Sequence, residues 1–134
     1  MNELTLNFKS YCGNYSLTFE DNGKVSYAYL KKGNEIQGDV WLYNRCMAPD
    51  VSEWSDKKNI PFANCSGFIS VKGTITTPVC PSDVLVDWES DENGPVAYIY
   101  LFEELIGVVG VHDKPGYSRY AIKNGPVAKV MEIV

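Results

Sequence analysis

Apolar and polar positions alternate through the first quarter of the chain. The alternation runs from Leu4 to Phe8, from Tyr15 to Phe19 and from Lys24 to Leu30. A period of two residues is typical of β-strands. The Asn-Gly turn at residues 20–23 is a strong signal for a hairpin between the second and third of these segments. The pattern therefore predicts an antiparallel meander at the N-terminus.

The segment Glu35–Asn44 is the densest in apolar and aromatic residues near the middle of the chain. Val40 and Leu42 alternate with Trp41 and Tyr43, so both faces of the predicted strand carry large side chains. We expect this strand to be covered on both faces and to be central, and we expect the rest of the fold to be organised around it.

From residue 45 to residue 81 the alternation is lost. A long loop is expected here, anchored by apolar residues, with a short strand at Gly67–Val71. Strand patterns return at Val84–Trp88 and Val96–Phe102, joined by a polar hairpin tip at Glu89–Pro95, and a last strand is predicted at Leu105–Val111.

The C-terminal residues suggest helices instead. Ser118 is a suitable N-cap for a helix over Arg119–Asn124, and Gly125 stands where a glycine often ends a helix. Pro126 is suited to the first turn of a second short helix that would run to Met131. The expected fold is therefore a β-rich α+β domain over residues 1–134, with an antiparallel meander sheet curled or packed as a small sandwich or barrel and one or two short C-terminal helices.

The charge narrows the classes of partner. The chain has 134 residues, a formal net charge of −5 and 45% hydrophobic residues, which indicates a folded domain. A nucleic-acid-binding protein needs a basic surface, so nucleic acid is not expected as a partner, whereas a basic protein is compatible. The N-terminus lacks the basic and apolar regions of a signal peptide, and no apolar run is long enough for a membrane span. We expect a cytoplasmic protein.

Four cysteines and one histidine limit metal and redox chemistry. None of the cysteines forms a Cys-x-x-Cys pair, so neither a zinc site nor another cofactor is expected. Without an export signal a disulfide framework is not expected either, and the sequence suggests four reduced thiols packed as small hydrophobic side chains.

An acidic run is the most prominent polar feature. Its members are Asp83, Asp87, Glu89, Asp91 and Glu92. Residues 89–94 match the first half of a calcium-binding loop, but the twelfth position is Tyr100, which cannot supply the bidentate carboxylate. Two interpretations stay open. The run is either a solvated hairpin tip or a contact surface that steers a basic partner.

The sequence contains few residues that could form a catalytic site. His112 is the only imidazole, with Ser118 or a cysteine as a conceivable nucleophile and Asp113 as its orienting group. Adjacent residues such as His112 and Asp113 do not naturally form a base and orienter pair, and no Gly-x-Ser-x-Gly motif is present. We expect a loop histidine bound to backbone and no enzymatic activity.

The three tryptophans have different expected roles. Trp41 and Trp88 lie within strand patterns and are expected in the core. Trp54 lies in the polar loop and is the best candidate for a contact anchor, because tryptophan is enriched at interface hot spots. Together with the nine tyrosines it could instead line a sugar-binding face.

Two blocks of the sequence carry a resemblance to a known class of proteins. The first is Gly38–Arg45 with the following Ala48-Pro49, Glu53-Trp54 and Pro61-Phe62, and the second is Lys114–Arg119 with Ala121 and Gly125–Lys129. Together they resemble small, acidic, cytosolic bacterial proteins encoded beside polymorphic toxins, which act as immunity proteins. The resemblance implies a protein that binds one toxin domain and blocks it without chemistry of its own.

The expected contact residues follow from the acidic run and the loop tryptophan. Asp87, Glu89, Asp91 and Glu92 would steer and contact the toxin, and Trp54 would be a buried anchor. The alternative function is a carbohydrate- or small-ligand-binding β module that uses Trp54 and surface tyrosines. A small enzyme that uses His112 is a third possibility.

Overall fold

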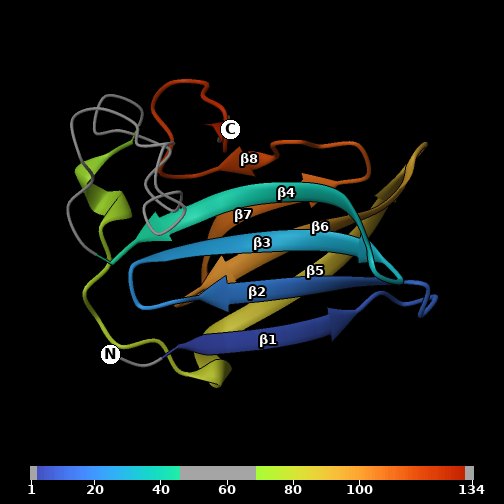
Figure 1. Cartoon of the computed structure of the whole chain (residues 1–134), viewed down its shortest axis with the longest axis horizontal. Helices are drawn as coiled ribbons and strands as arrows, with labels where there is room; N and C mark the ends of the chain where they lie inside the picture. Colours follow the sequence, from blue (N-terminus) through green and yellow to red (C-terminus); the bar gives the residue numbers. More distant parts are fainter. Residues whose placement is uncertain (1–2, 46–68, 132–134) are drawn as a thin grey trace.

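Two β-sheets pack face to face (Figure 1). The structure, a computed structural model, describes residues 3–45 and 69–131. The first sheet is antiparallel, and its strands are adjacent in chain order. These strands are β1 (Leu4–Lys9), β2 (Tyr15–Asp21), β3 (Val25–Lys32) and β4 (Glu35–Asn44). The predicted N-terminal meander is confirmed.

The second sheet contains five strands in chain order. They are β5 (Val84–Asp91), β6 (Gly94–Leu101), β7 (Glu104–Gly110), β8 (Tyr117–Ser118) and β9 (Lys129–Val130). All neighbouring pairs are antiparallel except β8 and β9, which are parallel. The described part of the connection between the sheets contains two 3-10 turns, η3 (Val71–Gly73) and η4 (Pro81–Asp83). The hairpin between β5 and β6 is tighter than predicted, because pairing continues to Asp91 and Gly94.

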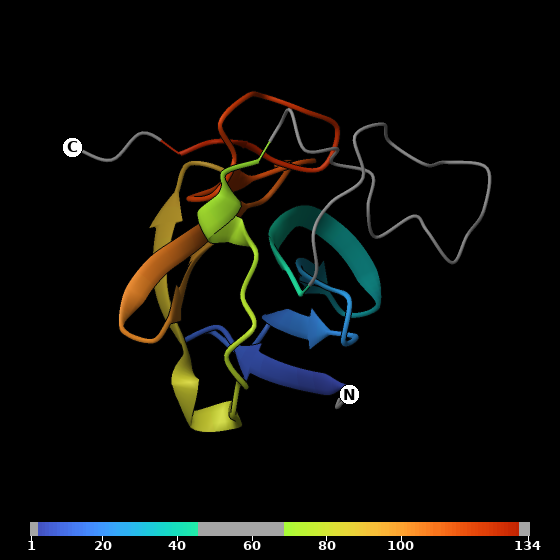
Figure 2. The same cartoon turned by 90° about the vertical axis from the view of Figure 1, so that its left-hand side faces the viewer.

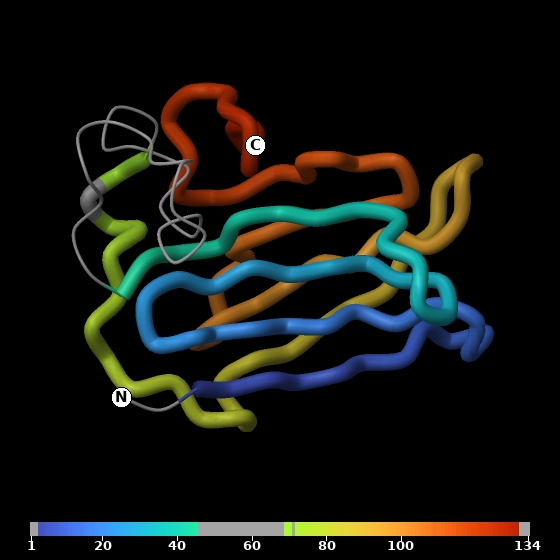
Figure 3. The backbone as a smooth tube through the Cα atoms, viewed as in Figure 1, coloured from blue at the N-terminus to red at the C-terminus, as the bar shows by residue number. Residues whose placement is uncertain are grey.

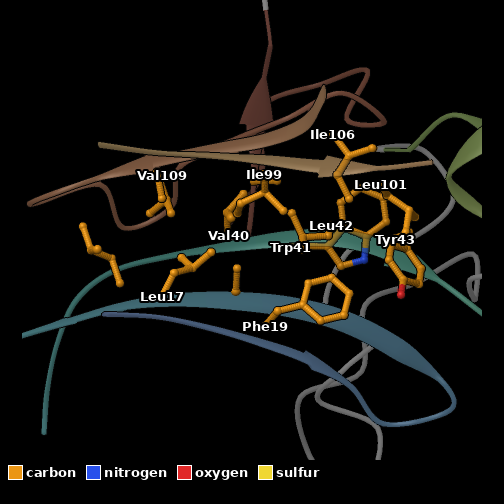
Figure 4. Packing of buried hydrophobic residues seen from close by; sticks show 14 of the residues in the cluster. Leu17, Phe19, Val40, Trp41, Leu42, Tyr43, Ile99, Leu101, Ile106 and Val109 are labelled. Carbon is orange, nitrogen blue, oxygen red and sulfur yellow. The ribbon is translucent and has the colours of Figure 1, made fainter. Parts of the chain in front are cut away.

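The core lies between the two sheets (Figures 2 and 4). Each sheet contributes alternate residues of its strands, such as Leu17 and Phe19 from β2 and Ile99 and Leu101 from β6. All four side chains are almost completely buried. Trp41 and Trp88 are 0% and 7% exposed, so their expected place in the core is confirmed.

The strand expected to be central, β4, is the last strand of its sheet. Its free edge is nevertheless covered by the C-terminal part of the chain (Figure 1). The Asp39 N–H donates to the Asp113 carbonyl at 2.9 Å, and the Trp41 N–H donates to the Val127 carbonyl at 2.9 Å. Residues 40–44 are all buried. The prediction of a strand covered on both sides is confirmed, but its central position is wrong, because irregular C-terminal backbone takes the place of a fifth strand.

The predicted C-terminal helices are wrong. Residues 3–45 and 69–131 contain no α-helix, and no helix among them is long and apolar enough to cross a bilayer. Ser118 is a buried residue of β8, and its Oγ accepts a hydrogen bond from the Tyr120 N–H at 3.3 Å. The Lys129 N–H donates to the Gly116 carbonyl at 2.9 Å, which joins the returning chain to the sheet. A single capped turn is too short to be stable alone, so sheet pairing decides the local structure.

The predicted short strand at Gly67–Val71 falls partly outside the described residues. Within them, Ile69 makes an isolated bridge to Ala121, and the backbone then enters η3. The two sheets form a sandwich rather than a closed barrel.

Candidate functional site

Strand β5 separates its side chains cleanly between two environments. Val84 and Trp88 point into the core, whereas Asp87 and Glu89 are exposed on the opposite face. Alternate side chains of a strand lie on the same face about 6.6 Å apart, since each residue advances the chain by roughly 3.3 Å. Asp91 continues this exposed row at the end of the strand. The spacing in the sequence therefore places three carboxylates on one face.

The tip of the β5–β6 hairpin adds a fourth carboxylate. Glu92 and Asn93 form the two-residue connection, and both are exposed. The Asp91 Oδ1 accepts the Asn93 N–H at 2.8 Å, which stabilises the turn, and Gly94 adopts a positive φ of 131°. Figure 3 shows this hairpin extending at the right-hand side of the view.

Four members of the acidic run are thus brought together, and we call Asp87, Glu89, Asp91 and Glu92 the acidic edge. Asp83 does not belong to it. Its Oδ2 accepts the Cys80 N–H at 2.8 Å within η4, before β5 begins. This carboxylate has a local structural role.

The carboxylates of the acidic edge have no cationic partner in the described part of the chain. The two ion pairs there join Arg45 to Asp21 and Arg119 to Glu104. Since like charges stand side by side without neutralisation, the local potential is negative. Such a surface attracts a cationic group of another molecule.

A row of side chains that the sequence analysis did not single out borders the acidic edge. Cross-strand pairing connects Asp87 to Tyr98, Tyr98 to Val108, Val108 to Tyr117 and Tyr117 to Lys129. The Lys129 Nζ lies 5.6 Å from the centre of the Tyr117 ring. We call this series, from Asp87 to Lys129, the tyrosine row. It crosses the outer face of the second sheet, and its aromatic and apolar side chains lie between the Asp87 carboxylate and the Lys129 ammonium group.

A signal for this row is present in the sequence. Tyr98 and Tyr100 are two residues apart in a strand whose intervening residue, Ile99, is fully buried. Because successive side chains of a strand point to opposite faces, the burial of Ile99 places both tyrosines on the outer face. On the strand beside them, Leu85 is 59% exposed, which adds apolar surface next to the acidic edge.

A cleft of about 340 Å³ opens between the acidic edge and the β1–β2 turn. It is lined by Ser10, Tyr11, Cys12, Trp88, Glu89, Ser90 and Pro95. Tyr11 is 83% exposed. The cleft therefore has the exposed Tyr11 on one side and residues 88–90 of β5 on the other.

The cysteines differ from the sequence expectation. Cys12 and Cys80 are free cysteines, and both are exposed instead of packed as small hydrophobic side chains. The Ser10 Oγ lies 3.4 Å from the Cys12 Sγ, and this hydrogen bond lowers the pKa of the Cys12 thiol. Cys46 and Cys65 lie outside the described residues.

A second pocket, of about 700 Å³, lies beside the buried Asp21 and Arg45. Both side chains make several internal hydrogen bonds. The Asp21 carboxylate accepts the Gly23 N–H and the Tyr43 hydroxyl, and the Arg45 guanidinium donates to two backbone carbonyls as well as to Asp21. These bonds give both polar groups a structural role.

The described residues that were considered for catalysis, Ser118, Asp113 and His112, each make separate local contacts. The Ser118 hydroxyl is buried and bound to the Tyr120 N–H, and the Asp113 Oδ2 accepts the Gly110 N–H at 2.8 Å. His112 is exposed, and its backbone N–H donates to the Gln37 carbonyl at 2.9 Å. In residues 3–45 and 69–131 no group of three or more His, Cys, Asp and Glu is placed to hold a metal ion.

Trp54, the expected anchor, lies outside the described residues. Comparison of the chain with protein-family models, with curated proteins and with solved structures finds no match. The acidic edge, the tyrosine row and the adjoining cleft are therefore interpreted from their geometry alone.

Proposed function

We propose that this chain is a non-catalytic binding protein that sequesters a basic protein domain in the cytosol, in the manner of an immunity protein that neutralises a toxin. The observation that carries the proposal is the acidic edge. Its carboxylates share one exposed face of a strand and have no cationic partner among the described residues. The sandwich supplies a rigid support directly behind them.

The physics of association supports this role. Neighbouring carboxylates of the row, such as those of Asp87 and Glu89, are two residues apart, which is about 6.6 Å along the strand. That spacing is shorter than the Debye length of about 8 Å at physiological ionic strength, so an approaching cationic surface meets the summed field of neighbouring carboxylates. Complementary charge of this kind raises the association rate above the roughly 10⁵–10⁶ M⁻¹s⁻¹ of neutral pairs. Rapid capture suits an inhibitor that must act before its target does.

The tyrosine row adds the contact area that charge alone does not provide. Tyr98 presents aromatic surface next to Asp87, and Tyr117 extends it two strands further along the row. An arginine of the partner can stack on such a ring while it pairs with the neighbouring carboxylate. The surface therefore fits a basic protein better than a basic small molecule.

Co-expression with the protein encoded immediately upstream tests the proposal. We expect that protein to arrest growth when it is expressed alone. Co-expression of this chain should restore growth, and the two proteins should co-purify as a stable complex. A harmless upstream protein that does not co-purify with the chain would contradict the assignment.

The tyrosine row also favours a second candidate function, a carbohydrate-binding module. Aromatic rings on an exposed sheet face can stack on sugar rings. Titration of a panel of oligosaccharides while tyrosine and tryptophan fluorescence is recorded separates the two candidates. Saturable quenching that is lost in Tyr98→Ala would favour the sugar-binding module, whereas no response to any glycan leaves the protein-binding function in place.

A further inference from the structure

Strand β5 is the first strand of its sheet and pairs only with β6 in the described part of the chain. The Phe102 N–H donates to the Asp83 carbonyl at 3.1 Å, and this bond fixes which residues of the hairpin exchange hydrogen bonds. Antiparallel pairs alternate between bonded and non-bonded residues. The residues of β5 bonded to β6 are thus Leu85, Asp87, Glu89 and Asp91.

The intervening residues direct their backbone N–H and C=O groups away from β6. These residues are Val86, Trp88 and Ser90. In residues 3–45 and 69–131 no hydrogen bond joins these backbone groups to another segment. The free edge therefore offers a series of donors and acceptors at the spacing that an additional strand requires.

The cleft beside the free edge leaves room for side chains of such a strand. Trp88 and Ser90, two of the residues with free backbone groups, line it from one side, and Tyr11 lines it from the other. A strand added to β5 directs alternate side chains towards this cleft and the others towards the outer face that carries the acidic edge. The two faces of the added strand therefore favour different residues. Apolar side chains suit the face towards the cleft, and cationic side chains suit the face towards the carboxylates.

We propose that the basic partner docks by adding an extended segment of alternating cationic and apolar residues to the free edge of β5. This inference rests on the proposed function and specifies how the partner is held. Backbone hydrogen bonds to Val86, Trp88 and Ser90 provide the attachment, and the acidic edge selects the charge of the incoming strand.

The charge pattern argues against a second copy of this chain as the occupant. In an antiparallel pair of two β5 strands the carboxylates of the acidic edge would face each other, and like charges opposite one another are destabilising. Strand β1, the first strand of the other sheet, has Thr5, Asn7 and Lys9 as its exposed residues. That edge lacks the anionic row that would select a basic segment.

A synthetic peptide of seven residues, alternating arginine and valine and blocked at both ends, serves as the probe. Its binding is measured by amide hydrogen exchange and chemical-shift mapping of the intact chain. We expect new protection at the amides of Val86, Trp88 and Ser90, because the intervening amides are already bonded to β6. Two analogues, one N-methylated at the arginines and one at the valines, test the backbone contact. One of them should bind at least tenfold more weakly and the other like the parent peptide, since only alternate amides of an added strand face β5.

Two variants of the protein separate this inference from the proposed function. Ser90→Pro removes one outward N–H on an edge strand, where proline is tolerated, and should weaken peptide binding about tenfold. The double variant Asp87→Lys/Glu89→Lys should abolish binding. Strand addition would be refuted if both N-methylated analogues bound like the parent peptide and no β5 amide became protected. If binding still depended on the charges in that case, the acidic edge would remain the contact surface. Binding that is unchanged by charge reversal would refute the acidic edge as the contact surface.

Discussion

Arg45 holds the Asp21 carboxylate through two nitrogen atoms, because Nε and Nη2 each lie 2.8 Å from Oδ2. The Tyr43 hydroxyl donates to the same oxygen at 2.7 Å. The Nη1 of Arg45 reaches the carbonyls of Ile75 and Thr77 at 3.1 and 2.6 Å. One ion pair thus connects the ends of β2 and β4 to the segment that leads into the second sheet.

Substitution of Asp21 tests how much this ion pair contributes. Asp21→Asn removes the charge that compensates Arg45, and Asp21 itself is 1% exposed. Breaking a buried pair in this way costs roughly 3–5 kcal/mol of the free energy of unfolding. Urea titration of the wild type and the variant measures the loss. The double variant Asp21→Leu/Arg45→Met should recover part of it, and a single variant within 1 kcal/mol of the wild type would contradict the role of the pair.

Alkaline pH should weaken the fold through Tyr43. Burial, followed by the hydrogen bond to the Asp21 carboxylate, raises the pKa of Tyr43 well above its usual value of 10.0. A pKa raised in the folded state gives stability that is fully present below pH 10 and is lost as the pH rises above it. The loss for one tyrosine approaches about 1.4 kcal/mol per pH unit.

Tyr43→Phe checks the alkaline effect. The variant loses the hydrogen bond to Asp21 and should be about 1–2 kcal/mol less stable at pH 7. Its free energy of unfolding should then fall less steeply between pH 10 and pH 12 than that of the wild type. Burial also raises the pKa of Tyr27 and Tyr29, so a smaller alkaline loss should remain in the variant. Parallel pH profiles would show that Tyr43 is not the group responsible.

Gly38 of β4 lies directly against the end of β7 and the residues that follow it. A Cβ on Gly38 would lie 2.5 Å from the Gly110 carbonyl oxygen and 3.0 Å from that of Asp113. Gly38→Ala should therefore cost about 2 kcal/mol, because backbone of the second sheet would have to move. Gly13→Ala is the contrasting variant. Gly13 has φ +79° with no atom within 4 Å of the added Cβ, and only the backbone strain of about 1 kcal/mol is expected there. Equal losses in the two variants would show that the close approach does not matter.

The acidic edge should contribute nothing to folding. Asp87→Asn/Glu89→Gln removes two exposed charges that have no cationic partner in the described residues. Substitutions of this kind usually change stability by no more than about 0.5 kcal/mol. The midpoint temperature of thermal unfolding of the double variant should equal that of the wild type or lie slightly higher, because the substitutions relieve the repulsion between neighbouring carboxylates. A marked loss of stability would assign these carboxylates a structural role instead.

The strands were largely predictable because their sequence signals are local. A period of two residues from Leu4 to Phe8 and an Asn-Gly turn at residues 22–23 need no knowledge of the rest of the chain. The C-terminal segment was mispredicted for the opposite reason. Its capping signals around Ser118 are local, but its structure is set by contacts with Gly116 and β4, which are distant in sequence.

The candidate site was predictable in part. The alternation of Asp87 and Glu89 with core residues could be identified from the sequence, and both are exposed as the pattern implies. The outward direction of Tyr98 follows from its alternation with Ile99, but the alignment of the row across the strands and the position of the cleft could not be predicted, because each depends on the register between strands. A different register would have separated Tyr98 from Asp87. Trp54 remains a prediction from the sequence alone.

The central claim is that the acidic edge captures a basic protein, and the association rate with the upstream protein tests it most directly. Asp87→Lys/Glu89→Lys is compared with Glu3→Lys/Glu35→Lys, a variant of the same net charge. Its two exposed positions lie just before β1 and at the start of β4, away from the acidic edge. Stopped-flow measurement at low and high salt should show at least a tenfold lower rate for the first variant at low salt. The second variant should remain close to the wild type. Equal rates for the two variants would contradict the account, because only net charge and not the acidic edge would then govern association.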